Sequence, residues 1–196
     1  MYDVFTSSRR FLRQSPAPGR TVALIAAGAD LALALGIGVV RATLVGVGQH
    51  RAEGWLPTVA LALILAAPGI LALIGAATAR PVLFGAAGIA CLPLAAISIA
   101  ALPIWLPAIG FFSAFTLASR ANLWTWADGL TIAGFVALLL VALTMVLASN
   151  GQYSYTYPGG GTEGGDYIVP GRAAASIAVV LADIALATAF AHRERR

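Results

Sequence analysis

Long apolar stretches constrain the fold of this chain more than any other feature of its sequence. They cover residues 21–40, 56–79, 82–119, 129–149 and 173–191. Charged residues make up only 10% of the chain, whereas about a quarter of the residues in a soluble domain are charged. The sequence therefore predicts an all-α integral membrane protein that forms one polytopic domain over residues 1–196.

The stretch at residues 82–119 is too long for a single crossing. One helix of this length would extend about 57 Å, nearly twice the ~30 Å hydrocarbon core of a bilayer. We expect a break at ALPIWLP (101–107), because Pro103 and Pro107 lack backbone donors and Trp105 prefers the headgroup boundary. The result is a bundle of six transmembrane helices at about 21–40, 56–79, 82–101, 104–119, 129–149 and 173–191.

The arginines test this number of crossings independently. With six helices and a cytoplasmic N-terminus, nine arginines face the cytoplasm and three, Arg41, Arg51 and Arg172, face outside. With five helices, five arginines face inside and seven outside, against the usual bias of basic residues toward the cytoplasm. We therefore expect a multi-pass protein of the bacterial plasma membrane with both termini cytoplasmic.

The N-terminal sequence SRRFLRQ (8–14) is similar to a twin-arginine export signal. The apolar stretch that follows, at residues 21–40, is longer than the apolar region of a cleaved signal, which spans about 7–15 residues. We therefore expect that stretch to remain in the membrane as the first helix.

Two acidic residues, Asp30 and Asp183, lie inside expected spans. A carboxylate at the bilayer centre costs at least about 2.5–3.5 kcal/mol on insertion scales. Small residues share the helical face of Asp30 and bulky aliphatic residues occupy the opposite face, so Asp30 is expected to point toward a neighbouring helix. No arginine or histidine lies inside an expected span. Both acids are therefore expected to be neutral and to donate hydrogen bonds to a carbonyl or hydroxyl group.

Three interpretations of these acids remain open. They serve as hydrogen-bonding groups between helices, they pair with an arginine of another subunit, or they form a proton- or cation-responsive site. We expect no metal and no cofactor. The single cysteine, Cys91, lies in an apolar run, and the two histidines, His50 and His192, lie outside the spans.

Residues 150–171 form the one long polar segment, which lies outside in the expected topology. Tyr153, Tyr155 and Tyr157 alternate with polar residues, as in a short strand. The glycine-rich centre lets the chain return so that Tyr167–Val169 pairs back, which predicts a small hairpin. Tyrosine offers a large contact area with little loss of side-chain entropy, so we expect these four tyrosines to contact a partner subunit.

No motif in the chain identifies a reaction. There is no GxSxG, HExxH or P-loop sequence, and no cluster of acids typical of a metal-dependent lipid transferase. The expected function is a non-catalytic accessory or structural subunit of a larger membrane complex, such as a respiratory or envelope assembly. Its expected partners are other membrane subunits and the lipid bilayer, and not nucleic acid.

Two other functions remain as alternatives. Six helices in 196 residues, both ends inside and the spacing Ala23-xxx-Ala27 resemble the substrate-binding subunits of energy-coupling-factor vitamin transporters. That resemblance implies a carrier for a small solute. The second alternative is a lipid-modifying enzyme that uses Asp30 and Asp183 as acid and base.

Overall fold

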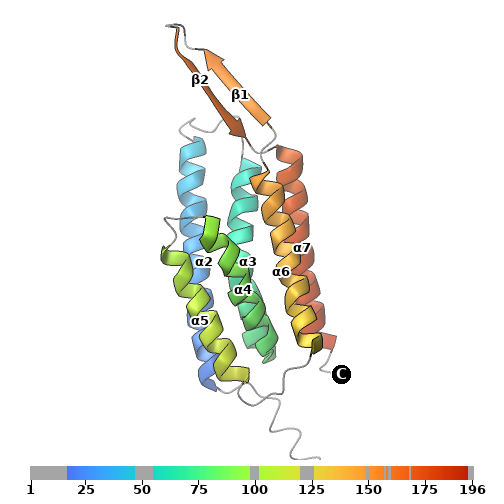
Figure 1. Ribbon diagram of the computed structural model, residues 1–196. Helices are drawn as coiled ribbons and strands as arrows, with labels where there is room; N and C mark the ends of the chain where they lie inside the picture. The colour runs from blue at the N-terminus through green and yellow to red at the C-terminus, as the bar shows by residue number, and fades with distance from the viewer. Residues whose placement is uncertain are drawn as a thin grey trace, which may run out of the picture.

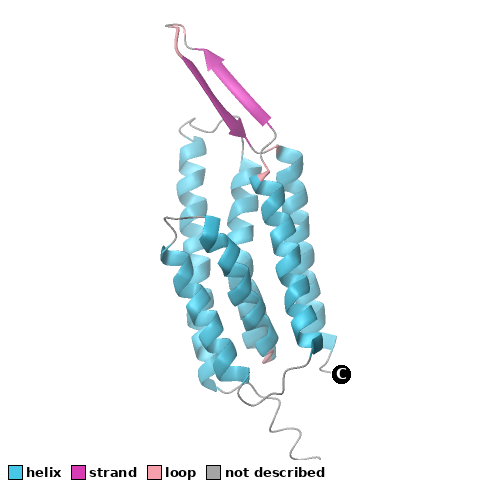
Figure 2. Ribbon diagram, in the orientation of Figure 1, coloured by secondary structure: helices cyan, strands magenta, loops and turns pink. Residues whose placement is uncertain are grey.

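The structure is a computed structural model in which a bundle of helices carries a β-hairpin at one end (Figures 1 and 2). It describes residues 17–46, 55–97, 102–119, 126–148, 151–156, 158, 160–167 and 169–193. The helices are α2 (Ala17–Gly46), α3 (Trp55–Thr78), α4 (Pro81–Ile97), α5 (Leu102–Ser119), α6 (Trp126–Leu147) and α7 (Pro170–Arg193). The strands are β1 (Gly151–Thr156) and β2 (Thr162–Tyr167). We call the end of the bundle that carries the β-hairpin the hairpin end, and the opposite end the C-terminal end.

Four of the described helices, α2, α3, α6 and α7, are long and apolar enough to cross a membrane. These helices indicate a membrane protein. The other two, α4 with 17 residues and α5 with 18, are also apolar but shorter. In Figure 1 the α4–α5 pair starts at the C-terminal end of the bundle and turns back before it reaches the hairpin end. The long apolar run is therefore broken into two helices, as the sequence predicts.

The position of that break differs from the prediction. Helix α4 ends at Ile97 and α5 begins at Leu102, so Pro103 and Pro107 both lie inside α5. Pro103 falls in the first turn of the helix, where a backbone N–H has no partner within the helix. A proline at such a position is compatible with helix, which is why Pro103 does not mark the turn, whereas Pro107 lies in the helix interior and is tolerated there at the loss of one backbone hydrogen bond. The intervening residues 98–101 lie outside the described part of the chain.

Small residues allow α2 and α5 to approach closely. A Cβ added at Gly110 of α5 would lie 2.6 Å from the Cβ of Ala26 on α2. Near the C-terminal end, a Cβ at Gly19 would lie 3.1 Å from the carbonyl oxygen of Ala114 and 3.3 Å from the Cβ of Ala118. The face of α2 that carries these contacts is buried, whereas its leucine-rich opposite face is exposed, as the helical wheel predicts.

The turn from α3 to α4 is a Schellman motif. Ala79 has a φ of 57°, in the left-handed region, and the Arg80 N–H donates a hydrogen bond of 2.8 Å to the carbonyl of Gly75. Pro81 then opens α4 at the first helical position, where its missing N–H costs nothing. This tight turn fixes α4 against α3.

Ala79→Gly is expected to raise the free energy of unfolding by about 1 kcal/mol, because a left-handed conformation costs roughly 1–2 kcal/mol for a residue with a Cβ and little for glycine. Thermal unfolding in detergent micelles measures the change. Cys91 is the one cysteine of the chain and is fully buried, so its reaction with a thiol-reactive dye reports loss of the bundle. Ala77→Gly, within the last turn of α3, is the control and should lower stability. Equal effects of the two changes would contradict the prediction.

The β-hairpin predicted in the polar segment is present, although its second strand begins earlier than expected. β1 and β2 pair antiparallel, with Gly151 opposite Tyr167, Tyr153 opposite Gly165 and Tyr155 opposite Glu163. Because directly opposed residues share a face and alternate residues along a strand return to it, positions 153, 155 and 167 lie on the same face of the ladder. The fourth tyrosine, Tyr157, lies outside the described residues.

Candidate functional site

Helix α3 carries Pro68 at mid-length. A proline inside a helix removes one backbone hydrogen bond and weakens the local helix, since its ring occupies the space of the preceding turn. Helix α3 packs against α2 on one side and α7 on the other, and Figure 1 shows it between these two helices. Each neighbour carries one of the two intramembrane acids.

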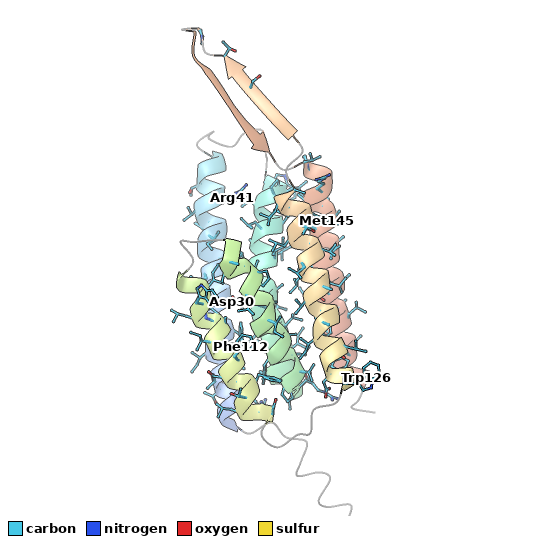
Figure 3. All side chains as sticks on the ribbon, in the orientation of Figure 1. Asp30, Arg41, Phe112, Trp126 and Met145 are labelled. Carbon is cyan, nitrogen blue, oxygen red and sulfur yellow. The ribbon has the colours of Figure 1, made fainter. Side chains whose placement is uncertain are left out.

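Asp30 of α2 meets the chain directly after this proline. Its side chain is 5% exposed, and its Oδ2 accepts a hydrogen bond of 2.8 Å from the backbone N–H of Gly69. A Cβ at position 69 would lie 2.9 Å from that oxygen and 3.2 Å from the carbonyl oxygen of Ala27, so the contact depends on glycine. Figure 3 shows Asp30 near the middle of the bundle. The carboxyl group therefore supplies an acceptor to α3 where proline disturbs the helix.

This bond differs from the sequence-based expectation, in which the acid donates a hydrogen bond. Three hydroxyl groups of α6 and α7 that could accept such a bond donate to backbone carbonyls. Ser176 Oγ donates to the carbonyl of Ala142 at 3.0 Å and so connects α7 to α6. Thr188 and Thr144 donate to carbonyls of their own helices. The expectation missed the backbone amide because a regular helix would already use it.

Asp183 has a different environment from Asp30. The residue is fully buried, with 0% exposure, and neither of its carboxylate oxygens has a hydrogen-bond partner among the described residues. It belongs to the buried face of α7, which packs on α3 and α6. That face consists of Ala173, Ser176, Val180, Asp183, Ala187 and Ala191.

The two acids lie at the level of Pro68 in α3. Helices α3 and α7 both start at the hairpin end, and Pro68 and Asp183 each follow the first residue of their helix by thirteen positions. At about 1.5 Å per residue both lie roughly 20 Å from that end. The candidate site is therefore the proline-containing segment of α3 with a carboxyl group on either side, one hydrogen-bonded to it and one without a partner in the described residues.

Sequence reasoning identified both acids but not the proline and glycine between them. The sequence feature that could have revealed this site is the pair Pro68–Gly69 in the middle of an apolar stretch. A proline there leaves backbone groups without a partner in their own helix, and side chains of neighbouring helices can bond to them. The structure does not bring the tyrosine positions of the hairpin near these acids, since β1 and β2 lie beyond the end of the bundle (Figure 1). Among the described residues no group of three or more histidine, cysteine or acidic side chains is placed to hold a metal ion.

Comparisons of the chain with protein-family models, with curated proteins and with solved structures found no match.

Proposed function

We propose that this protein is a non-catalytic accessory subunit of a larger membrane complex, and that the β1–β2 hairpin is the element that docks on its partner. In this proposal four helices and the α4–α5 pair lie in the membrane, both termini are cytoplasmic and the hairpin is outside. The observation that carries the proposal is the position of the hairpin, which projects beyond the helices (Figure 2).

A two-stranded hairpin without further packing is at best marginally stable in water. Neither strand packs extensively against a helix in the described part of the chain. Strand β2 also contains Gly164 and Gly165, which weaken a strand because they have no side chain to pack. A partner that covers the tyrosine-bearing face or extends the ladder by another strand would supply the missing contacts.

The described arginines support the proposed orientation. Arg20, Arg80 and Arg193 lie at the C-terminal end of the bundle. Arg41 and Arg172 lie at the hairpin end. The excess at the C-terminal end favours a cytoplasmic location for that end. Helices α4 and α5 start and finish at that same end. The other segments therefore keep the same side of the membrane whether or not this pair crosses it.

Replacing the two tyrosines of β1 in the variant Tyr153→Thr/Tyr155→Thr is expected to weaken the partner's association about tenfold or more. Loss of aromatic anchors at an interface typically costs about 2 kcal/mol, and threonine retains strand propensity. The measurement is the amount of partner recovered with the protein from native membranes in mild detergent. The control is Ser154→Ala/Thr156→Ala on the opposite face of the ladder, which should retain the partner.

A photo-crosslinking residue in place of Tyr153 should capture the same partner, and one in place of Ser154 should not. Unchanged association of the tyrosine variant, with Cys91 still protected from dye, would contradict the docking role. If association is unchanged but uptake of a solute is altered, the hairpin covers a transport site and the carrier alternative replaces this proposal.

A further inference from the structure

An open groove of about 400 Å³ lies on the surface of α2 and α3, toward the hairpin end of the bundle. Six of its lining residues are apolar, among them Leu33, Gly36, Ile37 and Leu61, and the seventh is Arg41. Figure 3 shows Arg41 on α2 near the hairpin end, well above Asp30. The groove, which we call the α2–α3 groove, is therefore separate from the two acids.

The groove exists because α5 covers only part of α2. The two helices run in opposite directions, with Gly110 of α5 beside Ala26 of α2. Leu102, the first residue of α5, precedes Gly110 by eight positions and therefore reaches about the level of Ala34. Beyond that level α2 continues without cover from α5. Its residue Val40 is 60% exposed.

The groove spans the depth of the membrane that a phospholipid occupies, from its headgroup to its acyl chains. Arg41 follows Asp30 by eleven residues, which places it about 17 Å further along α2. Half of a ~30 Å hydrocarbon core is about 15 Å, so with Asp30 near the midplane Arg41 lies at the headgroup boundary. The apolar lining between these two residues then lies at the depth of acyl chains.

We propose that the α2–α3 groove binds one phospholipid with an anionic headgroup, with its phosphate on Arg41 and an acyl chain along Gly36. An arginine at the headgroup boundary can donate paired hydrogen bonds from its guanidinium group to the phosphate oxygens of a lipid. The groove is otherwise apolar, and this favours a lipid over a free phosphate ion. The inference does not depend on the docking role of the β-hairpin.

The test uses the full-length protein, mixed in detergent with equal parts of phosphatidylglycerol and phosphatidylcholine and then examined by native mass spectrometry. The native protein should retain phosphatidylglycerol in preference to phosphatidylcholine. Arg41→Gln should lower the retained phosphatidylglycerol about tenfold, because it removes the charge-assisted hydrogen bonds to the phosphate. Gly36→Leu should lower retention of both lipids, because its side chain occupies the groove.

Matched controls are available on the same helix. Neither Gly36 nor Gly28 has an atom within 4 Å of an added Cβ, so leucine fits at both positions and only Gly36 lines the groove. Gly28→Leu should retain lipid as the native protein does. Arg20→Gln, which removes an exposed charge at the opposite end of α2, should also leave retention unchanged.

Three results would overturn the inference. The first is equal retention of both lipids by the native protein, Arg41→Gln and Gly36→Leu. The second is loss of bound phosphatidylglycerol on addition of inorganic phosphate, which would indicate a site for the free anion. The third is efficient disulfide formation between two copies of Gly36→Cys, which would show that another copy of the chain fills the groove.

Discussion

Gly110→Leu is expected to separate α2 from α5 and to expose Cys91 to a thiol-reactive dye at temperatures at which the native protein excludes it. Already a Cβ at position 110 would lie 2.6 Å from the Cβ of Ala26, and leucine adds three further carbons. A Cβ has no alternative rotamer, so the overlap is relieved only by moving one helix. Overpacking in a core typically costs 1–3 kcal/mol, and here we expect a loss of about 3 kcal/mol or more.

Gly134→Leu on α6 is the matched control, because no atom lies within 4 Å of a Cβ added there. It should unfold at or above the temperature of the native protein, since leucine favours helix over glycine. Gly110→Ala should lie between the two variants. If Gly110→Leu unfolds at the same temperature as Gly134→Leu, α2 and α5 do not cross as closely as the structure indicates.

Asp30→Ala is expected to destabilise the protein by about 1–3 kcal/mol, because it leaves the Gly69 N–H buried without its acceptor. Asp30→Asn should cost much less, since the amide oxygen can accept the same hydrogen bond. Dye reaction with Cys91 during heating measures both changes. Asp183→Ala is the comparison, because the Asp183 carboxyl group has no hydrogen bond to lose among the described residues.

A smaller effect of Asp30→Ala than of Asp183→Ala would contradict the assigned role of the Gly69 bond. The asparagine variants separate structure from chemistry. If Asp30→Asn folds and associates normally but the activity of the complex is lost, a proton carried by this group is the better explanation of its place in the membrane. Loss of a partner subunit instead would indicate an ion pair with that subunit.

The order of the helices and their approximate bounds were predictable because they follow from local features of the sequence. Apolar stretches of defined length, bounded by charged or polar residues, predicted the described helices to within four residues at each end, except that α2 extends six residues beyond its expected end at Val40. The period of the small residues on α2 identified its packing face. The alternation of tyrosines at 153 and 155 predicted a strand, because alternation along a strand is also a local property.

The site around Pro68 was not predictable in the same way, because it depends on contacts between distant segments. Nothing near Asp30 in the sequence shows that Gly69 will face it, since the two residues meet only when α2 packs on α3. The turn between α4 and α5 was misplaced for a related reason. Pro103 and Pro107 permit a turn, but a proline in a first helical turn, such as Pro103, is equally compatible with continued helix, and Pro107 lies inside α5.

The shortness of α4 and α5 has a consequence for the bilayer around the protein. At 1.5 Å per residue, the 17 residues of α4 extend about 26 Å, whereas the 25-residue span of α2 at Gly19–Thr43 extends about 37 Å. Trp105, which is 45% exposed near the start of α5, brings an interfacial side chain to the shorter flank. A short apolar flank is accommodated by local thinning of the bilayer, so we expect thinner hydrocarbon beside α4 and α5 than beside α2. Such hydrophobic mismatch favours thin regions of membrane and brings the short flanks of neighbouring proteins together, because a shared deformation involves fewer lipids than two separate ones.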